Sequence, residues 1–297
     1  MSKISHRDAL RTTTMFLCDS NIEAYYDNLL NTQVAAMKGT LSSIGTIEGL
    51  KQYVRSEKKA IDNIITLLGI SGEKFKRVVS WIRLSKGFTF DSEWSLSSLR
   101  TKMIGDSRLM EEFCELFING YASTKFITIV PRFILQDFRI DDEVMRRLTS
   151  DDYVRNLVKD KVTTEYNTRY ADLYVKTLHN KIKEIAQTHG LEFRKMQIPN
   201  YSSDELALAY AGKYIVINHH FYLTTSSSQT NYYNDVIQPK YAKAQSMPNV
   251  NVLNILDGAG WIGRAADFKK VFADCNYFLN LKSIDKLNDI IKEFFNI

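Results

Sequence analysis

The stretch Glu205-Leu-Ala-Leu-Ala-Tyr-Ala-Gly-Lys-Tyr-Ile-Val-Ile-Asn-His-His-Phe-Tyr-Leu223 decides the fold. It holds two apolar runs of strand length, residues 205–210 and 214–223, joined by a short turn at 211–213. The glycine in this turn supplies backbone freedom, so the sequence predicts a β-hairpin. The second run carries Asn218, His219 and His220 in its middle. Polar side chains in a buried strand need partners or a function, and these three therefore mark a candidate site.

The segments after the hairpin continue an α/β pattern. A polar loop, residues 224–230, follows the second strand. A further strand is predicted at 250–256, and it ends at Asp257-Gly258-Ala259-Gly260-Trp261. Residues 267–287 then predict a helix, a strand at 277–281 and the start of another helix.

Four of these features together resemble the type II restriction endonucleases of the DpnII/MboI group, within the PD-(D/E)XK nuclease superfamily. They are Ile217-Asn-His-His-Phe-Tyr222, the Ser/Thr loop, Pro248-Asn-Val…Asp257-Gly-Ala-Gly-Trp261 and Asn280-Leu-Lys-Ser-Ile-Asp-Lys-Leu287. In that group the strand ends in a Glu-x-Lys or Glu-x-Asn element followed by Phe-Tyr. A Gly/Ser-rich loop comes next, and a later strand closes with Thr-Asp-Gly-x-Gly-Trp. The resemblance covers about the last half of the chain.

This resemblance implies an α/β (α+β) fold, in which a nuclease-type core has a central mixed β-sheet flanked by helices. It also implies Mg²⁺ as cofactor, double-stranded DNA as substrate, and a two-fold homodimer that acts on palindromic sites. The chain departs from the family at Asn218, which stands where the family has a metal-binding glutamate. His220 stands where the family has Lys, Asn or Gln.

The change at Asn218 leaves three accounts open, because a hard divalent cation needs anionic oxygen ligands. The second carboxylate has moved to a helix, or the chain is an inactivated variant, or the protein binds DNA and no longer cuts it. Asp204 lies 14 residues before Asn218, which suits a hairpin that places the two side chains together. Strand alternation puts Asn218 and His220 on one face, with His219 opposite and Glu205 on the other face from Asp204.

Catalytic roles follow for these residues as hypotheses. Asp204 is the expected metal ligand beside Asn218, and His220 is a candidate general base, because a neutral imidazole accepts a proton near pH 7. A helix is predicted over 163–184, and the resemblance places such a helix against the sheet, often with an acid for the metal. Glu165 at the helix start and Asp172 further along are the candidate ligands. Helix capping and ion pairing with the nearby arginine are the structural alternatives.

The Ser/Thr loop is a candidate DNA-contacting segment. Hydroxyl groups bind phosphates, and amide side chains pair with adenine edges. The candidates are Ser226, Ser227, Ser228, Gln229 and Asn231. The same composition is also typical of a plain strand-to-helix connection.

Residues 1–150 are predicted to be mostly helical, with a domain boundary near 150 and the nuclease-type core over 151–297. Helices are predicted at 52–69 and 74–84, with a break and cap at 71–73. This pair is compatible with a helix-turn-helix, in which Lys74, Lys76 and Arg77 enter the major groove. The alternative is a solvated basic face on a bundle helix.

Composition sets wider limits. A net charge of +5 permits a polyanionic partner without requiring one. Three cysteines without CxxC spacing disfavour a zinc site or a disulfide framework, and we expect a reducing cytoplasm and no membrane. The sequence therefore predicts a type II site-specific deoxyribonuclease that uses Mg²⁺. A catalytically inactive or regulatory DNA-binding protein on a nuclease-like core is the alternative.

Overall fold

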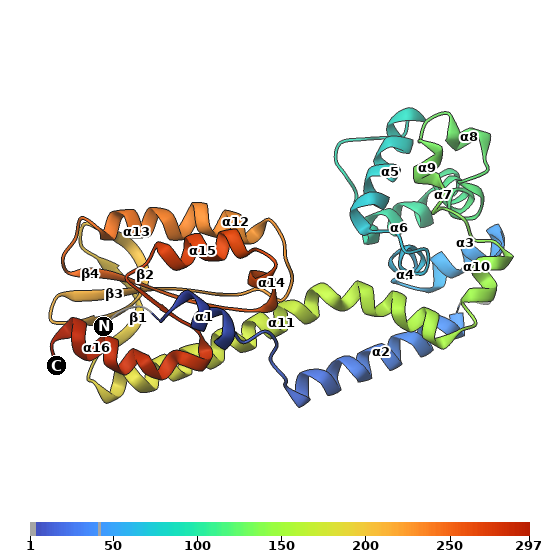
Figure 1. Ribbon diagram of the computed structural model, residues 1–297. Helices are drawn as coiled ribbons and strands as arrows, with labels where there is room; N and C mark the ends of the chain where they lie inside the picture. The colour runs from blue at the N-terminus through green and yellow to red at the C-terminus, as the bar shows by residue number, and fades with distance from the viewer. Residues whose placement is uncertain (1–3, 41–42) are drawn as a thin grey trace. The chain divides into compact units, whose positions relative to one another are not determined.

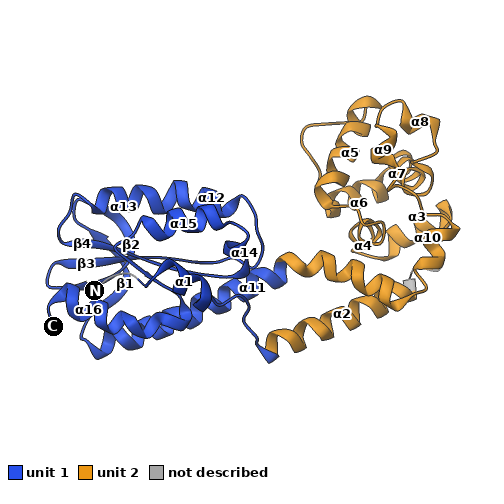
Figure 2. Ribbon diagram, viewed as in Figure 1, with its two compact units in different colours: residues 1–20, 165–297 blue, residues 21–164 orange. Residues whose placement is uncertain are grey.

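The computed structural model describes residues 4–40 and 43–297, and the chain forms two compact units (Figure 2). One unit combines residues 1–20 with 165–297, and the other is residues 21–164. The sequence suggested a single boundary near 150. The structure instead divides the chain at 20/21 and at 164/165, so the N-terminal segment belongs with the core.

The first unit is built on a central mixed sheet, as expected, and this sheet has five strands within the described residues. The strands run in the order β1-β2-β3-β4-β5. Strand β2 pairs antiparallel with β1 and with β3, whereas β4 runs parallel to β3 and β5 runs parallel to β4. The bounds are β1 Glu192–Ile198, β2 Ser202–Tyr210, β3 Lys213–Phe221, β4 Val250–Asp257 and β5 Tyr277–Leu279.

A two-residue turn sets the register of the central hairpin. Tyr210 pairs with Lys213, so only Ala211 and Gly212 lie between the strands. Both residues have positive φ, 48° and 76°, which is the backbone twist that suits a two-residue hairpin. The sequence placed this turn correctly but made it one residue longer.

Helices cover both faces of the sheet (Figure 1). One face carries α11 Asp151–Thr188 and α16 Leu287–Phe295, and α11 packs there through Tyr174 against Phe221. The other face carries α12, the π-helical segment η2, α13 and α15 (Figure 1). Their bounds are Ser228–Tyr232, Tyr233–Ile237, Gln238–Ala244 and Ala265–Ala273, and the remaining elements of this unit are α1 His6–Thr12, α14 Ala259–Ile262 and η3 Leu281–Lys286.

The second unit is helical, as predicted for the N-terminal region. Its core includes a stack of Phe75 on Phe117, with ring centroids 5.4 Å apart. The expected helix at 52–69 is two helices, α3 and α4, separated at residues 57–59. The bounds are α2 Ser20–Thr40, α3 Ile47–Ser56, α4 Ala60–Leu67, α5 Gly72–Ser85, α6 Leu96–Gly105, α7 Ser107–Asn119, α8 Thr124–Ile127, α9 Arg132–Leu135 and α10 Asp142–Arg147.

Two local predictions need correction. Helix α11 begins at Asp151 rather than near residue 163, so Glu165 lies inside the helix and does not cap it. Strand β1 was not predicted, because its charged residues, including Arg194 and Lys195, hide the alternation of an edge strand.

In the part of the chain that the structure describes, no helix is both long and apolar enough to span a bilayer.

Candidate functional site

The polar residues of β3 divide between the two faces of the sheet. His219 meets α11, where its Nε2 lies 2.9 Å from Nε2 of His179. Asn218 and His220 point to the opposite face: the ring of His220 contacts Tyr232 of α12, at 4.9 Å between centroids. The strand alternation that the sequence predicted is therefore present.

Glu205 shares the face of Asn218. The register between β2 and β3 pairs Ala207 with Val216, and continuing it by two residues places Glu205 across from Asn218. The Glu205 side chain is buried, and its Oε2 accepts a 2.6 Å bond from Nζ of Lys240 on α13. The acid beside Asn218 is thus Glu205, and its charge is neutralised.

Asp204, which the sequence placed beside Asn218, lies elsewhere. Its side chain is 62 % exposed, and its carboxylate stands 3.4 Å from Nζ of Lys195 on β1. The physical reason is the two-residue turn, because a shift of one residue in register moves a side chain to the other face of the sheet.

A buried amide pair fixes Asn218. Its Nδ2 donates to Oδ1 of Asn254 on β4, at 3.0 Å. Asn254 in turn donates to the backbone carbonyls of Val271 and Asp274, at 2.9 and 3.2 Å. Oδ1 of Asn218 is buried and has no hydrogen-bond partner among the described residues. The amide is therefore held with its oxygen free to accept a bond.

Aromatic rings surround His220. Its ring stacks on Tyr222, with centroids 3.8 Å apart and planes 8° from parallel. Burial lowers the pKa of His220 and raises the pKa of Tyr232, so both side chains are neutral near pH 7. Nδ1 of His220 is buried and lacks a partner within the described residues. A neutral imidazole in this state has a nitrogen available to hold or accept a proton.

The helix acids lie away from this face. Glu165 is exposed and forms an ion pair with Arg169, at 3.1 Å. Asp172 is exposed as well, on a helix whose buried side chains, such as Tyr174 and Leu178, point to the sheet. Helix α11 packs on the face of His219, so the structure does not bring either acid to Asn218.

The Ser/Thr loop is tightly built. Gln229 is fully buried: its Oε1 accepts from the Ser226 backbone N–H at 2.9 Å, and its Nε2 donates to the Thr224 carbonyl at 2.9 Å. Its amide is thereby used inside the protein and is not presented to base edges. The exposed members of the predicted set are Ser226, Ser227, Ser228 and Asn231.

The glycines of the 257–263 segment let this loop approach closely. A Cβ atom on Gly258 would stand 2.2 Å from the Tyr222 carbonyl oxygen, and one on Gly260 would stand 2.3 Å from that of Thr224. Their structural role is to dock the Ser/Thr loop against the end of β4.

Asp257 and Trp261 have structural roles. The Asp257 carboxylate accepts bonds from the backbone N–H groups of Thr14 and Leu281, at 2.6 and 2.7 Å, and from the Tyr174 hydroxyl at 2.9 Å. Burial raises the pKa of Asp257 to about 6, against these hydrogen bonds. Trp261 is fully buried.

The basic side chains of α5 are all engaged. Lys74 pairs with Asp137, Lys76 with Glu73, and Arg77 with Glu93. Each predicted phosphate contact in this unit therefore already has a carboxylate partner. This arrangement fits the alternative that the sequence left open, a solvated face on a bundle helix, and the structure adds the ion pairs.

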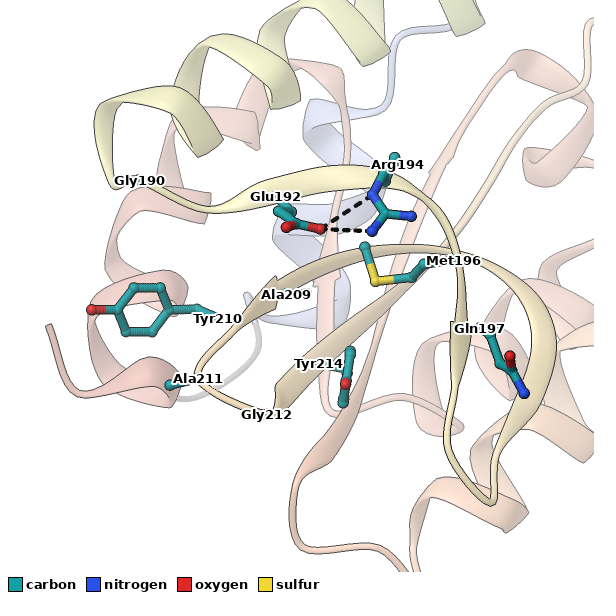
Figure 3. Close-up of a pocket in the computed structure, with 10 residues that line it drawn as sticks. All are labelled: Gly190, Glu192, Arg194, Met196, Gln197, Ala209, Tyr210, Ala211, Gly212 and Tyr214. Atoms are coloured by element: carbon teal, nitrogen blue, oxygen red, sulfur yellow. Dashed lines mark hydrogen bonds and ion pairs between the residues drawn. The ribbon is translucent and has the colours of Figure 1, made fainter.

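A pocket of about 520 Å³ lies at the end of the β1–β2–β3 meander that carries the Ala211–Gly212 turn (Figure 3). The ion pair of Glu192 and Arg194, at 3.0 Å, lines it together with Met196 and Tyr214. Met196 pairs with Glu205 in the sheet register, so the pocket opens on the same face as the candidate site.

The residues on this face do not fit a magnesium ion. Mg²⁺ favours near-octahedral oxygen coordination with at least one free carboxylate. The face offers Glu205, whose charge Lys240 already balances, and the neutral amide oxygen of Asn218. This set lacks the free carboxylate that a magnesium site needs.

Comparison with known proteins adds no assignment. No protein-family model, no curated protein and no solved structure matches this chain. The fold is α+β, and the site is defined by its own residues, Glu205, Asn218, His220, Tyr232 and Lys240.

Proposed function

We propose that this chain is a protein that binds double-stranded DNA on a nuclease-type core and does not cleave it in a metal-dependent way. One observation carries the proposal. Glu205 stands across from Asn218, where the resemblance implies metal ligands, but its carboxylate is paired with Lys240. A carboxylate held by an ammonium group does not supply the negative charge that a hard cation needs.

The DNA-binding part rests on the resemblance and on the Ser/Thr loop. Exposed hydroxyl groups and backbone N–H groups bind phosphates, and this loop presents Ser226, Ser227 and Ser228 directly after β3. Gln229 fixes the loop from inside, which lowers the entropy lost when a ligand binds. In the proposed form the protein is a cytoplasmic homodimer, because two-fold dimers match palindromic sites.

A metal-dependent type II endonuclease is the second candidate, and one observation favours it. Asn218 and His220 each present a buried polar atom without a partner in the described part of the chain, on the face of Glu205. Such atoms are ordinarily satisfied by a ligand, an ion or ordered water.

A plasmid assay separates the two candidates. Supercoiled plasmid is incubated with the protein in Mg²⁺, in Mn²⁺ and in EDTA, beside the Glu205→Ala and Asp204→Ala variants. The proposal predicts intact plasmid under all conditions, together with a mobility shift on native gels. Mg²⁺-dependent nicking that Glu205→Ala abolishes and Asp204→Ala retains would establish the endonuclease.

A further inference from the structure

The Glu205–Lys240 ion pair lies inside the candidate site rather than at its rim. Glu205 is 5 % exposed, and the Lys240 side chain is 29 % exposed. A buried carboxylate without a counter-charge is strongly disfavoured, so Glu205 needs a cation close to it. Lys240 Nζ, at 2.6 Å from Oε2, supplies that cation.

The helix that carries Lys240 follows a π-helical turn. The crossover after β3 is α12, then the π-helical segment η2 at Tyr233–Ile237, then α13. A π-helical turn shifts the faces of the helix that follows it, and such turns are frequent at functional sites. Here α12, before the turn, places Tyr232 against His220, and α13, after the turn, places Lys240 against Glu205.

The charges of this cluster balance without a metal. Glu205 contributes one negative charge, Lys240 contributes one positive charge, and Asn218 is neutral. A divalent cation at Glu205 would place two positive charges beside an ammonium group, which is repulsive in a site of low dielectric. Two features of the sequence, the amide at 218 and the lysine at 240, therefore oppose metal binding together.

We infer that the ammonium group of Lys240 takes the place of the divalent cation in this nuclease-type site, and that Lys240 and Asn218 jointly keep metal out. This inference rests on the proposed function, because it treats Glu205 and Asn218 as positions of a former metal site. It predicts that removing the ammonium group and restoring the second carboxylate creates a cation site that depends on Glu205.

The test is a thermal-unfolding and calorimetric titration with Mg²⁺ and Mn²⁺, at ionic strength matched with NaCl. The full-length protein is compared with Lys240→Met, Asn218→Asp and the double variant. The wild-type protein and Asn218→Asp are expected to show no shift in Tm with either ion. Lys240→Met is expected to lower Tm, because Glu205 loses its partner, and the double variant is expected to gain several degrees with millimolar Mn²⁺.

Two controls assign the effect to the site. Lys243→Met removes the next lysine of α13, which bonds to the backbone carbonyl of Tyr201 instead of a carboxylate, and it is expected to gain no cation response. Adding Glu205→Gln to the double variant is expected to abolish the Mn²⁺ response.

Three results would overturn the inference. They are a Glu205-dependent Mg²⁺ or Mn²⁺ response in the wild-type protein, the same response in Asn218→Asp with Lys240 in place, and no response in a folded double variant. If the double variant does not fold, Lys240→Gln combined with Asn218→Asp takes its place, and the absence of a Glu205-dependent response in that folded variant overturns the inference as well. Failure of the wild-type protein to bind DNA would sink the proposed function, while the cation titrations would be unaffected.

Discussion

At the scale of single residues, the site depends on which acid of the pair at 204 and 205 points inward. The structure selects Glu205, because the two-residue turn places it across from Asn218. Glu205 is almost fully buried against Lys240, whereas Asp204 is exposed beside Lys195. Two adjacent positions of β2 thus hold a buried residue of the candidate site and a solvent-exposed residue.

The two acids are expected to differ sharply in their effect on stability. Glu205→Ala leaves the Lys240 charge partly buried without a partner and is expected to cost about 3 kcal/mol of unfolding free energy. Asp204→Ala removes only an exposed ion pair and is expected to leave stability nearly unchanged. Urea unfolding of both variants measures the difference. Equal losses of unfolding free energy in the two variants would mean that the Glu205–Lys240 pair does not stabilise the unit.

This pair also shows what the sequence could and could not predict about the site. The hairpin, the candidate strand and the separation of Asn218 and His220 from His219 follow from strand alternation, and the structure has them. The inward acid did not follow, because a turn one residue longer exchanges the two faces of a strand. Lys240 was missed because a lysine on a crossover helix carries no signal in the local pattern.

The histidine pair on the opposite face predicts acid sensitivity. Burial, together with the nearby His179, His220 and Lys240, lowers the pKa of His219 to about 4. A depressed pKa gives stability that is present above the unfolded value of 6.5 and is lost as the pH falls toward 4. At most about 3 kcal/mol is involved, because one pKa unit corresponds to about 1.4 kcal/mol.

Unfolding of wild type and His219→Phe at neutral and acid pH measures this contribution. We expect the variant to lose less stability than the wild-type protein between pH 6.5 and 4. Asp257 has the opposite effect on the pH dependence of stability. Its pKa in the folded protein is raised to about 6, so its protonation below that pH stabilises the fold. It is present in both proteins, so the difference isolates His219. Parallel pH profiles would contradict this account.

At the scale of elements, the connection from β3 to α12 is held from two sides. Gln229 bonds to the loop from within, and the segment after β4 packs against its backbone through Gly258 and Gly260. The sequence predicted both segments but not their contact. Close backbone approach is a tertiary property, and the local pattern of Asp-Gly-Ala-Gly-Trp fits a simple turn equally well. The loop is therefore a fixed surface rather than a free connection.

Gly260→Ala tests this docking. The new methyl group would stand 2.3 Å from the Thr224 carbonyl, so the loop must shift, at a cost of about 1–3 kcal/mol in unfolding free energy. DNA affinity is expected to fall with it. Gly72→Ala is the matched control, because nothing lies within 4 Å of its Cβ position. If Gly260→Ala keeps both stability and affinity, the loop does not need this contact.

The ends of helices and the edge strand β1 were the hardest features to predict from the sequence. Tyr174, Leu178 and Ile182 form an apolar stripe with the spacing of a helix, and all three residues are fully buried on α11. Its true start at Asp151 was hidden, because residues 159–169, between the buried Val158 and Tyr170, include no buried side chain and so interrupt the apolar stripe. Glu165 consequently lost the first-turn position that the sequence gave it.

At the scale of the whole molecule, the chain joins a helical unit to a unit built on a five-stranded sheet, and we propose that DNA contact lies chiefly on the sheet unit. In the helical unit, Lys74, Lys76 and Arg77 each have a carboxylate partner. Lys76→Ala is therefore expected to change DNA affinity little, whereas replacing Ser226, Ser227 and Ser228 together by alanine is expected to weaken it. Electrophoretic mobility shifts rank the variants, and the reverse ranking would place contact on the helical unit.

The central claim is that this protein binds duplex DNA without needing a metal. It is tested most directly by fluorescence anisotropy of a labelled duplex, titrated with protein in EDTA and in Mg²⁺ at matched ionic strength, over a series of salt concentrations. We expect the same Kd in EDTA and in Mg²⁺. The affinity should fall steeply as the salt concentration rises, because DNA binding releases counterions. The DNA should remain intact after the titration. Absence of binding at low salt, or binding and cleavage that appear only with Mg²⁺, would contradict this claim.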